Sequence, residues 1–232
     1  MSSNHVIEFK NVTKRYYTQG QRTLKELIQA LVLRRESPGQ FLIALEDFTL
    51  TLNKGESLGV IGRNGAGKST LLKLIAGVTS PTVGSIVVSG RIAPLIELGA
   101  GFHPELTGRE NVYLNAAMFG MNRPEIEEKF NSIVKFSELK NFIDTPVKYY
   151  SSGMYLRLAF AVAIHVDADI ILIDEILAVG DEKFQQKCLA RLNKLKDEGI
   201  TIIYISHNIQ SVLDFCERGV YLKNGKTAVI GP

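Results

Sequence analysis

Residues 58–75 constrain the fold of this chain more than any other part of its sequence. Residues 58–61 are a short apolar run typical of a buried strand. Residues 62–69 then read Gly-Arg-Asn-Gly-Ala-Gly-Lys-Ser, a match to the phosphate-binding pattern G-x-x-x-x-G-K-[ST], and an apolar run at residues 71–75 continues as a helix. This order predicts an α/β domain that binds a polyanion at the start of the helix. The alternative is a glycine-rich strand-to-helix turn without a ligand.

Each residue type in this loop suits phosphate binding. The glycines allow the loop to curl so that its amides point inward. Lys68 can reach the β- and γ-phosphates of a nucleotide, and the Ser69 hydroxyl can ligate Mg²⁺. The predicted nucleotide-binding residues here are Gly62, Arg63, Asn64, Gly65, Ala66, Gly67, Lys68, Ser69 and Thr70.

The composition fits one α/β domain with a sizeable core, because the chain has 232 residues of which 45% are apolar. Its net charge of +3, without a long run of one sign, argues against a broad basic face for nucleic acid. Cys188 and Cys216 lie in apolar periodic stretches, which predicts small core residues in a reducing compartment. No apolar run reaches the length of a membrane span, and Met1–His5 lack the features of a signal peptide. We therefore expect a cytoplasmic protein.

Residue periodicity predicts the remaining elements. Strands are predicted at residues 6–9, 41–52, 84–88, 170–173, 201–205, 220–222 and 227–230, with a hairpin turn at Asn224-Gly225. Helices are predicted at residues 110–118, 124–135, 153–164, 182–198 and 208–216, with Gly199 ending the fourth.

Residues 18–40 form an unusual stretch between the first two predicted strands. Apolar residues recur there at helical spacing beside basic residues: Leu24, Leu27, Ile28 and Leu31, with Lys25, Arg34 and Arg35. Pro38-Gly39 ends the pattern. Two interpretations remain open: a surface helix packed on its own sheet, or a contact with a partner or a membrane surface.

Two strand ends carry further candidate residues. Asp174 and Glu175 follow four aliphatic residues, so a buried parallel strand would place both carboxylates at its C-terminal edge. Asp174 is suited to hold Mg²⁺ through water, and Glu175 is suited to polarise the water that attacks the γ-phosphate. His207 follows the strand at residues 201–205 and is a candidate γ-phosphate sensor. The alternative for Asp174 and Glu175 is a solvated turn at the strand end. The alternative for His207 is a histidine with a purely structural role.

The order of these motifs resembles the nucleotide-binding subunits of ABC transporters. Residues 150–154, Tyr-Ser-Ser-Gly-Met, stand where this family has the signature Leu-Ser-Gly-Gly-Gln, at the opening of a helix. Residues 178–181, Ala-Val-Gly-Asp, resemble the family's D-loop, and His207 resembles its switch histidine. Residues 11–16 resemble the strand whose aromatic residue stacks on adenine, which assigns Tyr16 to that role, with Tyr17 as the alternative.

The resemblance implies an α/β fold of the ABC type, with a RecA-like core, an antiparallel β-subdomain and a helical subdomain at about residues 104–165. The whole chain, residues 1–232, is then one nucleotide-binding domain that hydrolyses ATP with Mg²⁺. The family also implies a dimer with two ATP molecules between the phosphate loop of one copy and the signature of the other. The signature residues that would contact nucleotide are Ser151, Ser152, Gly153 and Met154.

Several departures from the family's common pattern indicate which subgroup of the family this chain resembles. Glu97 stands where the family has a glutamine, and residues 105–111, 136–139 and 184–188 are similar to subunits that export polysaccharides. The nearest types are O-antigen exporters of the Wzt kind, then teichoic-acid exporters and, more distantly, capsule exporters; the inserted segment is also similar to theirs. This resemblance implies a membrane-spanning permease, a lipid-linked glycan reached through it, no nucleic-acid partner, and a peripheral place at the cytoplasmic face of the inner membrane.

Glu97 and Asp181 are expected in loops that couple hydrolysis to the permease. We predict that Glu97 faces the permease interface rather than ligating Mg²⁺. Two other classes remain as alternatives: a soluble ABC ATPase that acts on nucleic acid or ribosomes, and an importer ATPase.

Overall fold

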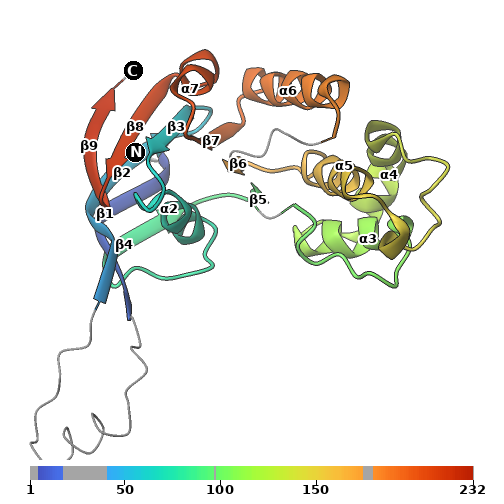
Figure 1. Ribbon diagram of the computed structural model, residues 1–232, viewed down its shortest axis with the longest axis horizontal. Coiled ribbons are helices and arrows are strands. Elements are labelled where there is room, and N and C mark those ends of the chain that lie inside the picture. The colour runs from blue at the N-terminus through green and yellow to red at the C-terminus, as the bar shows by residue number, and fades with distance from the viewer. Residues whose placement is uncertain (1–4, 18–40, 97, 175–179, 232) are drawn as a thin grey trace, which may run out of the picture.

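A computed structural model describes residues 5–17, 41–96, 98–174 and 180–231 (Figure 1). The predictions for the inserted segment, Glu97, Glu175 and Ala178 lie outside the described residues.

The described strands form two sheets. Strands β1 (His5–Tyr17), β2 (Phe41–Asn53) and β4 (Val83–Val88) form an antiparallel sheet in the order β2-β1-β4. The larger sheet has the order β5-β6-β7-β3-β8-β9 and is parallel from β5 to β8, with β9 antiparallel at the edge. Its strands are β3 (Ser57–Gly62), β5 (Ile92–Leu95), β6 (Ile170–Asp174), β7 (Thr201–Ser206), β8 (Arg218–Lys223) and β9 (Lys226–Gly231).

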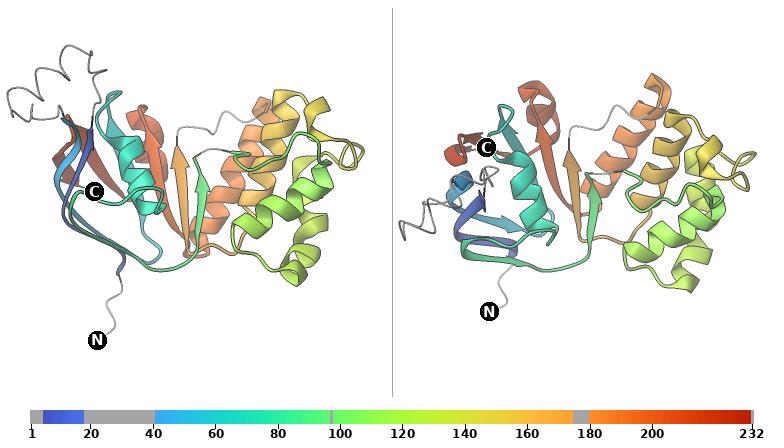
Figure 2. Two further views of the ribbon diagram at one scale, coloured as in Figure 1. Left: turned by 90° about the horizontal axis from the view of Figure 1, so that it is seen from below. Right: turned by 60° about the horizontal axis from the view of Figure 1, so that its bottom comes forward.

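The helices divide into two groups. Helices α3 (Gly108–Met118), α4 (Arg123–Ser137) and α5 (Ser152–Ala163), with the 3-10 turn η1 (Val147–Tyr149), lie together at one end of the molecule, and Figure 2 shows the antiparallel sheet at the other end. The other group lies beside the larger sheet and consists of α2 (Lys68–Ile75), α6 (Glu182–Asp197) and α7 (Ile209–Phe215). This arrangement confirms the predicted ABC-type α/β fold.

Two hydrophobic cores hold these elements together. The first packs both sheets against α2, and the rings of Phe9 and Phe48 meet in it at a centroid distance of 5.0 Å. The second joins the helices α3–α6 to the larger sheet through fully buried side chains such as Phe160 and Phe184. Because strands of the larger sheet contribute to both cores, that sheet is the rigid element on which the site is built.

The strand predicted at residues 6–9 is confirmed, but periodicity gave only its first part. Strand β1 continues to Tyr17 and pairs with β2 through several register shifts. Asn11 and its neighbour across the ladder, Asp47, both have φ of 48°, and the Asn11 side-chain amide donates to Asp47 Oδ1 at 3.0 Å. These left-handed residues break the alternation of buried and exposed side chains, which is the pattern by which a strand is recognised.

The two cysteines are free thiols, as predicted. Burial raises the pKa of both Cys188 and Cys216 to about 12, so neither thiol ionises near neutral pH. The prediction of a helix ending at Gly199 was also correct, because α6 ends just before it and Gly199 has φ of 81°.

Candidate nucleotide-binding site

The register of the larger sheet brings three predicted sites to one edge. Ile61, at the end of β3, pairs with Ser206 at the end of β7, and Asp174, the last residue of β6, pairs with Ile205. The phosphate loop, Asp174 and His207 therefore follow the carboxyl ends of neighbouring parallel strands. Ligands in open α/β sheets bind at this edge.

The phosphate loop is shaped by close backbone approaches that only glycine permits. A Cβ on Gly62 would lie 2.6 Å from the Leu222 carbonyl oxygen, and one on Gly67 would lie 2.5 Å from the Ala44 carbonyl oxygen. Gly67 also has φ of 109°. The Ala66 amide donates to the Arg63 carbonyl at 3.0 Å, which closes the turn. The loop is therefore a compact turn that leads directly into α2.

Helix α2 differs from α3–α7 at its N-terminus. Each of those five helices has a side-chain oxygen that accepts a hydrogen bond from a first-turn amide, supplied by Thr107, Asn122, Ser151, Asp181 and Asn208. Helix α2 begins after Gly67, with no side-chain cap and no acidic residue in its first turn. The first amides of a helix have no partner inside it, so this end offers donors and a positive dipole to an anion.

Lys68 turns back onto the loop that precedes it. Its Nζ donates to the Gly62 carbonyl at 2.7 Å and to the Arg63 carbonyl at 3.4 Å, and only 9% of the residue is exposed. The cation thus lies inside the loop, held by two carbonyl groups. A phosphate bound by the loop would be within reach of the same ammonium group.

A pocket of about 410 Å³ joins the phosphate loop to Tyr16. Residues of β2, including Ala44, complete its lining next to Lys68 and Ser69. The Tyr16 side chain is half-buried. Tyr17 is 73% exposed, and the centroid of its ring lies 4.7 Å from that of Phe41. Successive side chains of a strand face opposite ways, so only Tyr16 belongs to the pocket. Its position favours Tyr16 over Tyr17 as the residue that stacks on a base.

The loop after β7 is held rigidly by its own side chains. Ser206 is buried, and its Oγ accepts from the Asn208 amide at 3.0 Å and from Ser211 Oγ at 3.2 Å. Asn208 then caps α7. His207 stands exposed between these two anchored residues, a placement compatible with contact to a phosphate in the loop.

The donor set at this edge fits Mg²⁺. Ser69 lies in the first turn of α2, and half-buried Asp174 ends β6. Among the described residues there is no group of three or more His, Cys, Asp and Glu that could hold a metal by themselves. Mg²⁺ is usually bound by one or two protein oxygens together with water and substrate phosphates, so one hydroxyl and one carboxylate suit it.

The signature residues form a second pocket of about 460 Å³. Ser151 is the N-cap of α5, and its Oγ accepts from the Met154 amide at 3.2 Å. The predicted ligands Ser151 and Met154 therefore satisfy one another, whereas Ser152 and Gly153, the first two helical residues, keep amides without a partner inside the helix. Asp181 lines this pocket too. The pocket shares none of its lining residues with the one beside the phosphate loop.

Two residues of α5 that the sequence analysis missed connect the signature to other parts of the molecule. The Tyr155 hydroxyl donates to the Gly99 carbonyl at 2.8 Å, which ties α5 to the segment after Glu97. Arg157 forms ion pairs with Glu138 and Asp181. A signal for Arg157 was present, because it is the one charged residue in the otherwise apolar run at residues 154–164.

Comparison with known proteins identifies the class that this fold and site define. Residues 45–178 match the ABC transporter family, and the chain belongs to it as an ATP-hydrolysing cassette. An O-antigen export system ATP-binding protein, RfbB of Klebsiella pneumoniae, is 47% identical over 97% of this chain and 93% of its own length. A teichoic acids export ATP-binding protein, TagH of Bacillus cereus, is 40% identical over 98% of this chain and 41% of its own length.

Solved structures agree with this assignment. A dimeric structure of an ATP-binding cassette in a post-hydrolysis state, bound to ADP and Pi, matches with a TM-score of 0.76 and 26% identity over 97% of each chain. Within the part of the chain that the structure describes, no helix combines the length and apolar character needed to span a bilayer.

Proposed function

We propose that this chain is the ATPase subunit of an exporter that moves a lipid-linked polysaccharide, O-antigen or a similar cell-surface glycan, through a separate membrane-spanning permease. It would act at the cytoplasmic face of the inner membrane. The observation that carries this proposal is the similarity to an O-antigen export protein over nearly the full length of both chains, combined with a complete phosphate loop. Export of teichoic acid is the second candidate, supported by the 40% identity to TagH.

In this proposal each step of the chemistry is assigned to particular residues of the chain. The amides of the phosphate loop and of α2 bind the phosphates, Lys68 neutralises the γ-phosphate, and Tyr16 stacks on adenine. Mg²⁺, held by the Ser69 hydroxyl and through water by Asp174, would supply further positive charge at the phosphates. Glu175 takes the proton of the attacking water, and His207 contacts the γ-phosphate.

We further propose that one chain cannot complete a catalytic site. The phosphate-loop pocket and the signature pocket are separate, and each contains one helix N-terminus with unpartnered amides. Two ATP molecules between two copies would bring these halves together. ATP would then hold the two subunits in a dimer, and hydrolysis would allow them to separate.

A direct test of this arrangement is the mass of the particle in solution. Glu175→Gln with ATP and Mg²⁺ is expected to form a dimer by light scattering, and adding Ser152→Arg is expected to prevent it. A Glu175→Gln protein that binds ATP and stays monomeric at high concentration would argue for a self-contained site.

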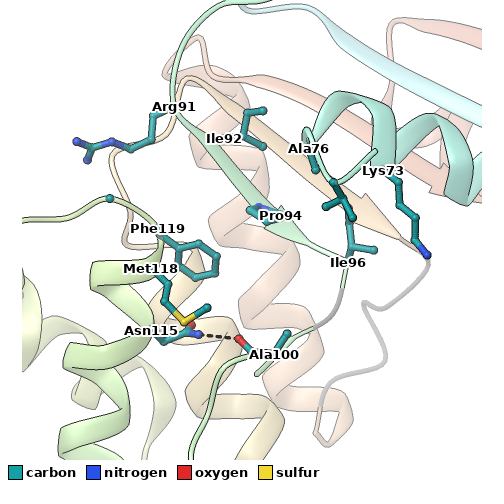
Figure 3. Close-up of a pocket in the computed structure, with 12 residues that line it drawn as sticks. Lys73, Ala76, Arg91, Ile92, Pro94, Ile96, Ala100, Asn115, Met118 and Phe119 are labelled. Atoms are coloured by element: carbon teal, nitrogen blue, oxygen red, sulfur yellow. Dashed lines mark hydrogen bonds between the residues drawn. The ribbon is translucent and has the colours of Figure 1, made fainter. Parts of the chain in front are cut away.

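An apolar groove beside the segment after Glu97 is the proposed seat for a cytoplasmic helix of the permease. The groove, of about 580 Å³, lies between α3, β5 and the end of α2, as Figure 3 shows. Met118 is 62% exposed on one wall, and Pro94 and Ile96 line the other. The Asn115 side-chain amide donates to the Ala100 carbonyl at 3.0 Å, which ties the wall of the groove formed by α3 to the segment at residues 98–101.

The groove can be tested separately from hydrolysis. Met118→Asp places a charge on an exposed position and is expected to lower export while the ATPase activity of the isolated chain is unchanged. Phe142→Asp, at a residue 49% exposed but outside the groove, is the matched control. Equal export by both variants would remove the groove from the mechanism.

The substrate class is tested in proteoliposomes that contain this chain and its permease. Lipid-linked O-polysaccharide is expected to be translocated in an ATP-dependent manner, and Glu175→Gln is expected to abolish translocation. Transport of a lipid-linked teichoic polymer alone would select the second candidate. ATPase activity stimulated by RNA or ribosomes, without glycan transport, would overturn the proposal.

A further inference from the structure

Lys14 and Tyr16 lie two positions apart near the end of β1, and their side chains meet. Residues at this spacing point to the same face of a strand. The Lys14 ammonium group lies over the Tyr16 ring, with Nζ 5.0 Å from the ring centroid. A cation at this distance is attracted by the face of an aromatic ring. The ring assigned to the nucleotide base is therefore held by a charge from its own strand.

Lys14 is itself held in place by the part of the chain that follows α2. Its Nζ donates to the Ser80 carbonyl at 2.8 Å. Thr82 fixes this segment to β1, because its amide donates to the Thr13 carbonyl at 2.8 Å and its Oγ1 accepts from the Arg15 amide at 3.0 Å. The carbonyl that receives the ammonium group thus lies two residues from a doubly bonded anchor, which limits where the cation can move.

Lys14 contacts the ring from outside the pocket that joins Tyr16 to the phosphate loop. The described residues that line this pocket include Tyr16 and Leu42, its partner across the β1–β2 ladder, but not Lys14. Leu42 is 59% exposed, so the ladder leaves an apolar surface beside the ring that a base can cover. The ammonium group does not occupy the space that a base would take. Its effect on a bound base therefore passes through the ring.

We propose that Lys14 is a positioning residue for the nucleotide base. This inference rests on the proposed role of Tyr16 in stacking on adenine. A tyrosine side chain has three staggered χ1 wells, and only the well that turns the ring toward the pocket can receive a base. The Lys14 ammonium group, anchored on Ser80, favours that well before the nucleotide arrives. A ring spread over all three wells would raise the apparent dissociation constant by the inverse of the competent fraction, about 3-fold.

The test compares a ligand that has a base with one that has none, in the full chain. ADP and pyrophosphate, each with Mg²⁺, are titrated by calorimetry, the second by its competition with ADP. Lys14→Met keeps the apolar stem and removes the charge, and water can replace the lost donor at Ser80, which is exposed. It is expected to weaken ADP binding by about 2- to 5-fold and to leave pyrophosphate binding unchanged, because the ring contacts only the base. In ATP hydrolysis KM is expected to rise by the same factor while kcat stays unchanged.

Three further variants separate positioning from folding and from simple charge. Lys14→Arg keeps a cation that stacks on aromatic rings, so it is expected to bind ADP within about 2-fold of wild type. Tyr16→Ala is expected to weaken ADP binding by about 5-fold or more, the lower end of base stacking, and Lys14→Met is expected to add nothing in that background. Lys10→Met is the matched control. Lys10 lies on the same strand and its Nζ pairs with Glu8 at 3.0 Å, so its loss is expected to leave ADP binding unchanged.

The role of Lys14 and the role of Tyr16 fail in different ways. If Tyr16→Ala binds ADP as the wild type does, the base does not stack on Tyr16 and the inference falls with that assignment. If Tyr16→Ala weakens ADP binding and Lys14→Met does not, Tyr16 keeps its role and Lys14 has none. If Lys14→Met weakens pyrophosphate binding as much as ADP binding, or weakens ADP binding further in the Tyr16→Ala background, Lys14 does not act through the ring.

Discussion

Replacing Gly67 by alanine gives a test of how the phosphate loop is built. Gly67 has φ of 109°, a conformation that costs an L-residue roughly 1–2 kcal/mol. The new Cβ would also lie 2.5 Å from the Ala44 carbonyl oxygen and 3.1 Å from Leu45 Cδ2. The Ala44 contact is a backbone atom and the Leu45 side chain is fully buried, so neither neighbour can move away freely. Overpacking of this kind costs about 1–3 kcal/mol more.

The expected total destabilisation for Gly67→Ala is therefore about 2–5 kcal/mol, which lowers Tm by roughly 5–20 °C for a chain of this size. Gly65→Ala is the matched control. Gly65 has φ of 79°, but a Cβ there meets nothing within 4 Å, so it should cost only the conformational part, roughly 1–2 kcal/mol.

Differential scanning calorimetry without nucleotide measures both changes. Gly67→Ala is also expected to weaken ATP binding, because Ala44 lines the pocket and must shift. Equal Tm values for Gly67→Ala and Gly65→Ala would refute the claim that the Ala44 carbonyl limits this position.

Three other predictions address hydrolysis, export and pH. Lys68→Ala is expected to abolish tight ATP binding, whereas Glu175→Gln should keep binding and lower turnover by about 10²- to 10⁴-fold in a phosphate-release assay; wild-type turnover in the latter would assign the wrong base. Leu27→Asp combined with Leu31→Asp is expected to reduce surface glycan in a complementation assay, and full export would leave the inserted segment a passive role. Burial, then the neighbouring positive charges, lowers the pKa of His165, so the unfolded chain takes up its proton first and stability falls as pH drops below about 6.5. His165→Asn should lessen the loss of Tm between pH 7.5 and 5.5, and an unchanged loss would exclude this residue as its cause.

The parts of the site that follow from local sequence could be predicted. The phosphate loop is a contiguous pattern, and Asp174 and His207 each follow an apolar strand, so parallel pairing alone brings them to one edge. The family resemblance added Tyr16 and the signature, and the structure places Tyr16 in one pocket with the loop.

Contacts between distant parts of the chain could not be predicted. Tyr155 bonds to Gly99 across 56 positions, and Glu138 meets Lys187 across 49. Neither pair has a periodic or motif signal, because each depends on how α5 and α6 pack against distant parts of the chain. The C-terminal turn of α4 was hard to recognise for a further reason. A helix that ends in the left-handed conformation usually has glycine at that position, and here Glu138 occupies it and forms two ion pairs.

The charges of the two pockets imply an order of events in the proposed cycle. The charged side chain that lines the phosphate-loop pocket is Lys68, and its helix has neither a cap nor a first-turn acid. The charged side chains that line the signature pocket are Arg157 and Asp181, which neutralise each other, so its attraction for phosphate depends on the amides and hydroxyl at the start of α5. The signature pocket, with no net charge on its lining side chains, attracts free nucleotide only weakly. It is better suited to contact a nucleotide that the phosphate loop of the partner already holds. ATP should therefore bind the phosphate loop of a separate subunit first, and closure on the partner's signature should follow, so that a subunit without nucleotide has no electrostatic reason to dimerise through this face.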